Sequence, residues 1–260
     1  MPEPLLRLTC FAGVLITMAG AEAFAPRRAL RAPKTTRWLN HFSLGLLSTV
    51  LLWLLFPVAA VGVATMAQEK GWGLLNHWRV GDWVAIAGSM VALDLLIYLQ
   101  HRVFHTVPLF WRFHRVHHAD LDLDVSSGIR FHPVEIGLSM LLKMLAVLAL
   151  GAPPTAVIAF EILLNATSLF NHSNIAIPVP LDRILRMVIV TPDMHRVHHS
   201  AIASETNHNF SFNLPWWDRL LGTYQGEPSA GQKSMTLGLA ERQNAALDQL
   251  PQLLLLPFRS

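Results

Sequence analysis

The chain has 260 residues, 52% of them hydrophobic and 14% charged, with 13 histidines and a formal net charge of +3. Soluble domains carry about 25% charged residues, so this composition excludes an ordinary soluble enzyme and indicates an integral membrane protein. The single cysteine excludes a disulfide framework. The small basic excess carries no nucleic-acid signature and fits contact with anionic lipid headgroups.

Four apolar stretches are candidates for crossing a bilayer, whose hydrocarbon core takes about 20 residues of helix. The last stretch is long enough for two passes, and the turn-forming sequence Gly151-Ala-Pro-Pro154 divides it, which predicts a short, partly inserted helical hairpin. We therefore expect an all-α bundle of about four transmembrane helices, the hairpin included. The stretches are residues 8–25, 42–67, 83–99 and 136–169.

The first stretch has two interpretations. Ala21-Glu-Ala23 and Ala23-Phe-Ala25 resemble the small-residue cleavage sites of a secretory signal peptide, which would remove residues 1–25. A signal peptide has a basic region before its apolar core, whereas only Arg7 precedes this one and the residues after it are strongly basic. These flanking charges favour a transmembrane helix.

The linker between the first two stretches sets the topology, because it contains five basic residues and no acidic one. The positive-inside rule places it in the cytoplasm. The third stretch then returns inward and brings His101 and His105 to the cytoplasmic side, and the hairpin brings His172 there too. We therefore expect a multi-pass membrane protein with its active site on the cytoplasmic side. The basic residues are Arg27, Arg28, Arg31, Lys34 and Arg37.

The chain is expected to form one domain with three parts. Residues 1–82 supply the N-terminal transmembrane helices, residues 83–225 form a catalytic core that contains the histidine motifs, and residues 226–260 form a C-terminal tail. Within them, the more polar segments 106–135 and 173–260 are expected to form a histidine-rich helical cap on the cytoplasmic side.

Nine of the 13 histidines fall in four short clusters. The pentapeptide His-x-x-His-His occurs twice, and residues at i, i+3 and i+4 share one face of a helix, so each repeat is expected to aim three nitrogens at one place. Neutral imidazole is the commonest protein ligand for zinc, copper and iron. Nine imidazoles exceed what one metal ion can hold, so the pattern predicts two ions. The clusters are His101-Arg-Val-Phe-His105, His114-Arg-Val-His117-His118, Asn171-His172 and His195-Arg-Val-His198-His199.

These clusters, in this order, resemble the fatty acid hydroxylase superfamily, also called the sterol desaturase family. The resemblance runs from about residue 94 to residue 224 and includes the phrases around the histidines. They are Phe110-Trp-Arg-Phe-His-Arg-Val-His-His118, Arg130-Phe-His-Pro-Val-Glu135, Thr191-Pro-Asp-Met-His-Arg-Val-His-His199 and Asn213-Leu-Pro-Trp-Trp-Asp-Arg-Leu-Leu-Gly-Thr-Tyr224.

The resemblance implies a membrane enzyme that uses O2 and external electrons to hydroxylate or desaturate a fatty-acyl, sterol-like or other long-chain lipid. It implies two iron ions, which zinc can replace in purified protein, and a separate electron donor of the cytochrome b5, ferredoxin or reductase type. One departure is His208-Asn209, where the family pattern has an aromatic residue and glycine, and His208 receives no ligand role. The implied ligands are His101, His105, His114, His117, His118, His172, His195, His198 and His199.

Carboxylates are expected to offset the charge of the metals and to orient the imidazoles. Asp94 lies two helical turns before His101 and serves either this role or a hydrogen bond between helices. His132 is either a metal ligand or the hydrogen-bond partner of one, or a cap on the turn before Pro133. The further candidates are Asp120, Asp122, Asp193 and Glu135.

Two other functions are compatible with clustered histidines. A membrane zinc hydrolase would use metal-bound water, but catalytic zinc usually takes three protein ligands and the chain contains no His-Glu-x-x-His motif. A metal transporter would carry polar residues along its membrane helices, whereas these ligands gather at one membrane boundary. A di-iron lipid oxygenase is the function that the sequence favours.

Overall fold

The computed structural model describes residues 1–244 and 249–259, and in this part of the chain the regular structure is entirely helical. The predicted all-α class is thus confirmed. The longer helices are α1 (Glu3–Phe24), α2 (Lys34–Leu55), α3 (Ala59–Lys70), α5 (Asp82–Thr106), α6 (Pro108–His118), α7 (Pro133–Leu150) and α8 (Pro154–His172). The shorter ones are α4 (Leu74–His77), η1 (Val125–Ile129), α9 (Val179–Leu185), α10 (Pro192–His198), α11 (Ala203–Thr206), α12 (Trp216–Leu220), α13 (Leu250–Leu255) and η3 (Leu256–Phe258).

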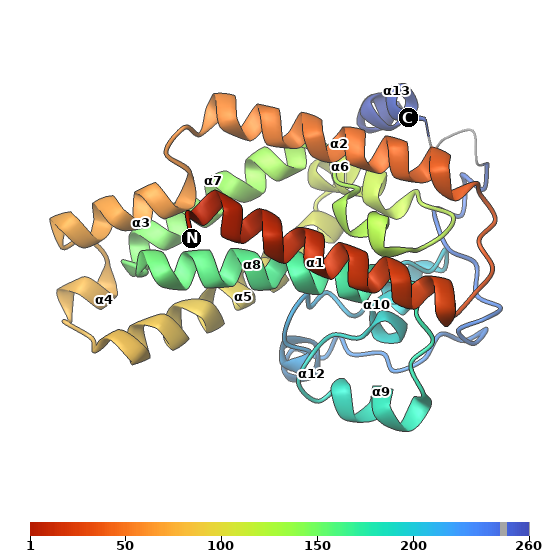
Figure 1. The fold of residues 1–260 in the computed structure, drawn as a ribbon. Helices are drawn as coiled ribbons and strands as arrows, with labels where there is room; N and C mark the ends of the chain where they lie inside the picture. Colours follow the sequence, from red (N-terminus) through yellow and green to blue (C-terminus); the bar gives the residue numbers. More distant parts are fainter. Residues whose placement is uncertain (245–248, 260) are drawn as a thin grey trace.

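Four segments are long and apolar enough to cross a membrane, as predicted: Glu3–Phe24, Lys34–His77, Asp82–Thr106 and Pro133–Leu150. Figure 1 shows the turn between α7 and α8 at the same end of the molecule as α3 and α4. The α1–α2 linker lies at the other end, with α6, α10 and the C-terminal segments. The histidine-bearing helix ends and the basic linker therefore share one end of the bundle.

The second apolar stretch, residues 42–67, contains no charged residue, yet it is divided between two helices. Helix α2 ends at Leu55 and α3 begins at Ala59. Pro57 lies between them; proline has no amide hydrogen to donate, and it disfavours helical geometry in the residue before it. Phe56 accordingly leaves the helical region with φ −130° and ψ 65°. The displaced α3 packs against α7 and α8.

The hairpin forms as the sequence predicted. Gly151 ends α7 with φ +67°, and its amide donates to the carbonyl groups of Val147 and Leu148. A left-handed residue at this position favours glycine. Pro154 begins α8 at a position where the missing amide hydrogen costs nothing.

The first helix is part of the bundle, which favours the transmembrane interpretation of residues 1–25. Helix α1 packs against α8, and Arg7 donates to the Glu161 carboxylate at 2.7 Å. Lys143 on α7 also pairs with Glu161. At the C-terminal end of α1, the buried Glu22 accepts from the amides of Val125 and Asn174 at 2.6 and 2.7 Å.

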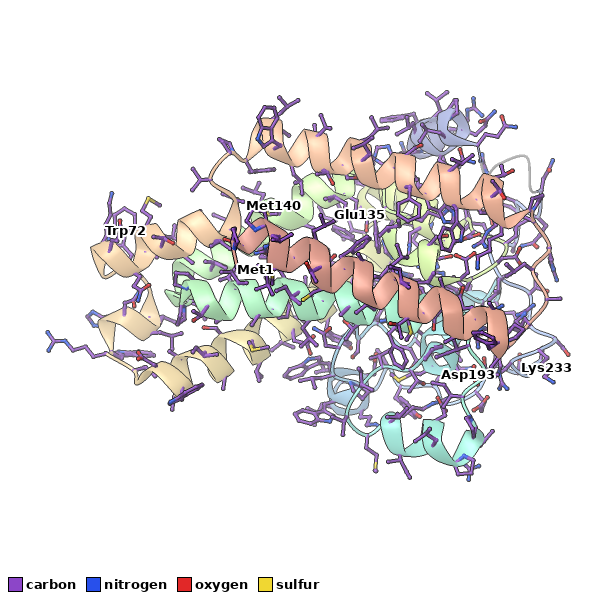
Figure 2. The ribbon with its side chains drawn as sticks, in the orientation of Figure 1. Met1, Trp72, Glu135, Met140, Asp193 and Lys233 are labelled. Carbon is purple, nitrogen blue, oxygen red and sulfur yellow. The ribbon has the colours of Figure 1, made fainter. Side chains whose placement is uncertain are left out.

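Exposed aromatic side chains gather at the end of the bundle opposite to the histidines. Trp72, Trp78 and Trp83 are all exposed there, and Figure 2 shows Trp72 far from Asp193 and Lys233. Tryptophan favours the membrane–water boundary, so this end has the character of an interface.

Candidate metal centre

Four helices bring the nine histidines together. The C-terminal half of α5 carries His101 and His105, and the last residue of α8 is His172. The two pentapeptides occupy the last turns of α6 and α10. Both of these helices begin with proline at a first-turn position, and Thr191 caps α10 by accepting from the amide of Met194.

The histidines form two groups, in each of which the candidate ligand atoms lie within 4.8 Å of one another. The first histidine group is His101, His105, His114, His118 and His198. The second histidine group is His117, His172, His195 and His199.

Each pentapeptide is divided between the groups, so the expectation that one repeat aims all three nitrogens at one place was wrong. In the first repeat, His114 and His118 join the first group and His117 joins the second. The second repeat does the reverse, with only its i+3 residue, His198, in the first group. Residues i+3 and i+4 are about 100° apart around a helix axis, so they diverge toward two neighbouring centres. Because each pentapeptide contributes to both groups, each group contains histidines from α6 and from the α10 segment.

The Nε2 atoms face one another within each group. In the first, Nε2 of His101 lies 3.0 Å from that of His114. In the second, Nε2 of His172 lies 3.0 Å from those of both His117 and His195. Nε2 of His199 is 3.2 Å from that of His195. Three further Nε2 atoms, of His105, His118 and His198, are buried without a hydrogen-bond partner.

Acceptors around the groups bind the opposite ring nitrogens. In the first group, Nδ1 of His101 lies 2.7 Å from the Phe210 carbonyl and that of His198 lies 2.8 Å from the His208 carbonyl. In the second, Nδ1 of His172 lies 2.7 Å from the Ser168 carbonyl and that of His117 lies 3.1 Å from the Arg130 carbonyl. A carbonyl only accepts, so each Nδ1 must carry the proton and each Nε2 must present a lone pair inward.

With Nδ1 protonated and a lone pair on Nε2, these residues fit metal ions. Nε2 of His117 and Nε2 of His172 both carry lone pairs, and at 3.0 Å these lone pairs repel. A shared cation converts that repulsion into two ligand bonds. Burial, reinforced by the neighbouring imidazoles, also lowers the pKa of several rings well below the usual histidine value, which keeps them neutral and able to bind metal. These rings are His117, His118, His195, His198 and His199.

Among the five candidate carboxylates, Glu135 touches a candidate ligand directly. Its Oε1 accepts from Nδ1 of His114 at 2.6 Å, and the residue is buried on the first turn of α7. Asp94 instead accepts from the side chains of Asn213 and Trp217 at 2.7 and 2.8 Å. Asp94 therefore makes the inter-segment hydrogen bonds that were its alternative role.

The other three carboxylates hold the basic linker against α10 and the loop that follows α6. Asp120 pairs with Arg37 at 2.8 Å. Asp193 pairs with Arg27 at 2.6 Å. Asp122 accepts from the backbone amides of residues 31 and 32 at 2.8 and 2.9 Å. The linker that indicates topology thus also anchors α10 and the loop after α6, through contacts between residues more than 80 positions apart that no local pattern reveals.

His132 lies outside both histidine groups. Its Nδ1 accepts from the amide of Val134 at 3.2 Å, so it caps the first turn of α7, which was its alternative role. His41 on α2 is also fully buried outside the two groups. It binds Ser126 at 2.8 Å and Arg130 at 3.1 Å.

Sequence reasoning missed several residues that surround the histidines. Trp111 lies against His105 and His118, with ring centroids 4.9 and 5.3 Å away. Phe131 stacks on His117 at 4.2 Å. The fully buried Asp218 accepts from the Phe210 amide at 2.8 Å and so fixes the carbonyl that orients His101. The only signal for them was their place within the motif phrases.

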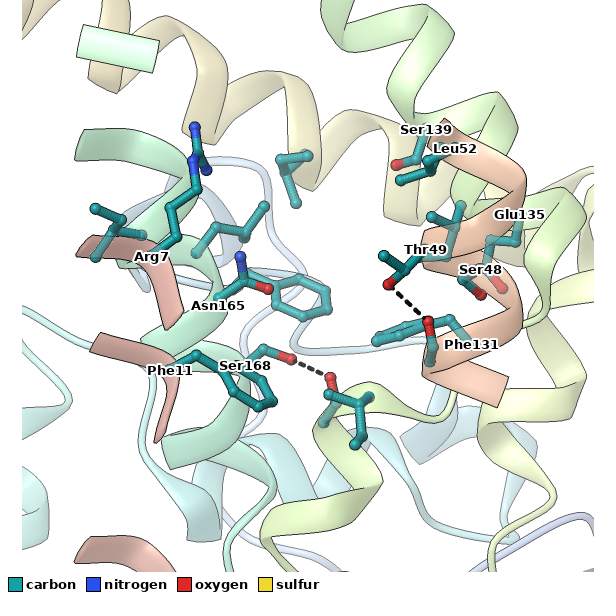
Figure 3. A pocket seen from close by; sticks show the side chains of 18 of the residues that line it. Arg7, Phe11, Ser48, Thr49, Leu52, Phe131, Glu135, Ser139, Asn165 and Ser168 are labelled. Atoms are coloured by element: carbon teal, nitrogen blue, oxygen red, sulfur yellow. Dashed lines mark hydrogen bonds between the residues drawn. The ribbon is translucent and has the colours of Figure 1, made fainter. Parts of the chain in front are cut away.

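A cavity of about 800 Å³ reaches the first histidine group from the bundle. Helices α1, α2, α5, α7 and α8 line it, and His101, His114 and Glu135 lie at its inner end. Figure 3 shows Phe11 on α1 and Leu52 on α2 on opposite sides of the space. Leu8 and Leu46 line it and are also exposed on the outer surface. The cavity therefore opens sideways between α1 and α2, toward the lipid.

A comparison with protein families matches the fatty acid hydroxylase family over residues 86–223. This range contains all nine clustered histidines and covers more than half of the chain.

The names of several similar proteins describe enzymes that act on lipids. An ornithine lipid hydroxylase (OlsE) of Rhizobium tropici is 32% identical over 177 residues, which cover 66% of this chain and 51% of that protein. The alkylglycerol monooxygenase of Homo sapiens is 30% identical over 141 residues, covering 54% and 30%. A very-long-chain aldehyde decarbonylase (GL1-1) of Oryza sativa subsp. japonica is 29% identical over 168 residues, covering 61% and 26%. The chain thus spans about half of the first protein and less than a third of the others. No solved structure matches it significantly.

Proposed function

The chain belongs to the fatty acid hydroxylase family, and we propose that it is a membrane-bound oxygenase that hydroxylates or desaturates a lipid with O2. In this proposal the two histidine groups hold two iron ions. The observation that carries it is the pair of adjoining imidazole groups at the inner end of an apolar cavity that opens toward the lipid. The names of the similar proteins support a lipid as the substrate.

The bound irons would supply the oxidising power for an unactivated C–H bond, which no side chain provides. Hydroxylation consumes one O2, two electrons and two protons, and it yields the alcohol and one water. Desaturation consumes the same reactants and yields a double bond and two waters. We assign the two electrons to a separate protein of the cytochrome b5, ferredoxin or reductase type.

The protein's own groups prepare the site for this chemistry. Carbonyl acceptors on Nδ1 turn the Nε2 atoms of four histidines inward, those of His101, His117, His172 and His198. Glu135 does the same for His114. Phe104, Phe131 and Phe212 line the cavity and exclude water near the metals. An acyl or alkyl chain enters between α1 and α2 and lies along the apolar wall with a carbon beside the first group.

We also propose that the active site faces the cytoplasm. The basic α1–α2 linker lies at the histidine end of the bundle (Figure 1), and basic linkers remain on the cytoplasmic side. This orientation gives a soluble electron donor access to the cap.

The test is O2 consumption by iron-loaded protein in lipid nanodiscs after reduction with dithionite, with mass spectrometry of the lipids. We expect lipid-dependent O2 uptake and a product heavier by one oxygen or lighter by two hydrogens. The variant His198→Ala should lose both, whereas the control His77→Ala changes an exposed residue outside the groups and should keep both. Lipid hydrolysis without O2 uptake would overturn the proposal in favour of a zinc hydrolase.

A further inference from the structure

Two short helices outside the four candidate membrane spans, α9 and α12, expose apolar side chains. Leu220 on α12 is 73% exposed, and Ile184 on α9 is 58% exposed. The two helices are joined, because Nε1 of Trp216 donates to the carbonyl of Met187 at 2.7 Å, and Figure 1 shows both on the side of the molecule away from α2. We refer to their outer surface as the α9–α12 patch. Its apolar members include Leu181, Ile184, Met187, Val188, Trp216 and Leu220.

The acidic residues of the same segments are turned inward. Asp182 on α9 is buried and pairs with the buried Arg186 at 2.5 Å, and Asp218 on α12 is fully buried. In water a short helix exposes its charges and covers its apolar side chains, whereas these helices bury charges and expose apolar side chains. An apolar surface of this kind marks contact with a membrane or with another protein.

The contacts of α12 with α5 favour the membrane. Nε1 of Trp217 donates to Asp94 at 2.8 Å, and the amide of Leu214 donates to the same carboxylate at 3.3 Å. Asp94 lies 12 residues after Asp82, where α5 begins, which is about 18 Å along the helix axis. With the start of α5 at the opposite interface, where Trp83 is exposed, this level lies inside a hydrocarbon core about 30 Å thick. Lipid reaches a surface at this depth, and a soluble protein does not.

The surroundings of the patch have the character of a lipid-facing surface. Leu99 and Val103 on α5 are exposed as well, so the patch adds to the apolar surface of a candidate membrane span. Arg183 on α9 is exposed, and an arginine side chain can lie along apolar surface while its guanidinium remains among the headgroups. The exposed ring of Trp216 has its only hydrogen-bond donor paired within the protein.

We propose that the α9–α12 patch is immersed in the lipid leaflet at the histidine end of the bundle, as a membrane contact additional to the four spans. It lies within a segment that the sequence assigned to the cytoplasmic cap. The contact also bears on the first histidine group, because Asp218 accepts from the Phe210 amide at 2.8 Å and the Phe210 carbonyl lies 2.7 Å from Nδ1 of His101. Immersion of α12 thus holds this group at a fixed depth. The contact does not depend on the proposed catalytic activity.

The test measures lipid and water access to single labels on the full-length protein in phosphatidylcholine nanodiscs. Cys10 is replaced by alanine, and a cysteine introduced by Ile184→Cys or Leu220→Cys carries an NBD fluorophore. Lys233→Cys is the control, because Lys233 is an exposed, charged residue outside the patch. We expect lipids with a nitroxide on the acyl chain to quench both patch labels, and dissolved iodide to quench only the label at position 233.

A second measurement needs no label. The difference in intrinsic fluorescence between the parent and Trp216→Phe is the emission of Trp216, whose ring is exposed on the patch. We expect lipids with brominated acyl chains to quench this difference. The substitution retains an aromatic ring, so it disturbs the fold little.

Three outcomes would overturn the proposal. In the first, iodide quenches the patch labels as strongly as the label at position 233, which would place the patch in water. In the second, the patch labels are shielded from iodide and are not quenched by nitroxide lipids, which would assign the patch to contact with a second protein chain. In the third, the emission of Trp216 persists in brominated lipids.

Discussion

The two histidine groups have the same ligand chemistry and different surroundings. The first group has five members, borders the cavity, is oriented in part by the Glu135 carboxylate and includes His105, which is only partly buried. The second has four members, all buried, and the acceptors for His117 and His172 are backbone carbonyls. The number of imidazoles therefore does not distinguish the roles of the two centres, but access does. The cavity reaches the first group, whereas the second is enclosed by the protein.

The largest effect is expected when each pentapeptide loses the histidine that belongs to the other histidine group, which is His117 in the first and His198 in the second. His117→Ala leaves three imidazoles in the second group, and His198→Ala leaves four in the first. Turnover should fall by more than about a hundredfold in both, because loss of a ligand exceeds the ten- to hundredfold cost of losing a ligand's partner. Metal analysis should show about one iron fewer per chain in His117→Ala and a smaller loss in His198→Ala. Full metal content and turnover in either variant would refute the ligand assignment.

The Glu135 carboxylate beside the first group is the next difference between the two groups to test. Glu135→Ala removes the acceptor from His114, so turnover or metal affinity should fall by about ten- to hundredfold, and the loss should be confined to the first group. Glu135→Gln keeps an acceptor oxygen and should recover part of this activity. Iron loss from the second group instead would show that the two groups are not independently held.

Access to the first group can be changed without touching either group. Leu46→Trp places a larger side chain at the opening between α1 and α2, where Leu46 lines the cavity. The KM for long-chain lipids should rise by about tenfold, in line with the cost of overfilling a packed site, while iron content stays unchanged. Leu47→Trp is the matched control, because this neighbour is also exposed but does not line the cavity. An equal effect in both variants would argue against a lateral opening here.

The smallest effect on the metals is expected from Asp94→Ala. The change leaves the side-chain donors of Asn213 and Trp217 without their acceptor, so the free energy of unfolding should fall by about 1–3 kcal/mol. Iron content should remain that of the parent. Iron loss at unchanged stability, measured by denaturant unfolding and metal analysis, would instead assign Asp94 to the metal site.

The sequence predicted what depends on local spacing and hydropathy. The i, i+4 pairs such as His101 and His105 do share a group, and the break at Gly151 does form the hairpin. The exchange of His117 and His198 between groups could not be predicted, because it depends on how α6 and α10 are oriented to each other. The pairing of Arg37 with Asp120 and the choice of Glu135 among five carboxylates also depend on contacts between distant segments.

Mössbauer spectroscopy of protein reconstituted with iron under anaerobic conditions tests the central claim most directly. The account predicts about two irons per chain in two distinguishable environments of equal abundance, because one group offers five imidazoles and the other four. A folded protein that binds a single iron, or two irons in one identical environment, would contradict it.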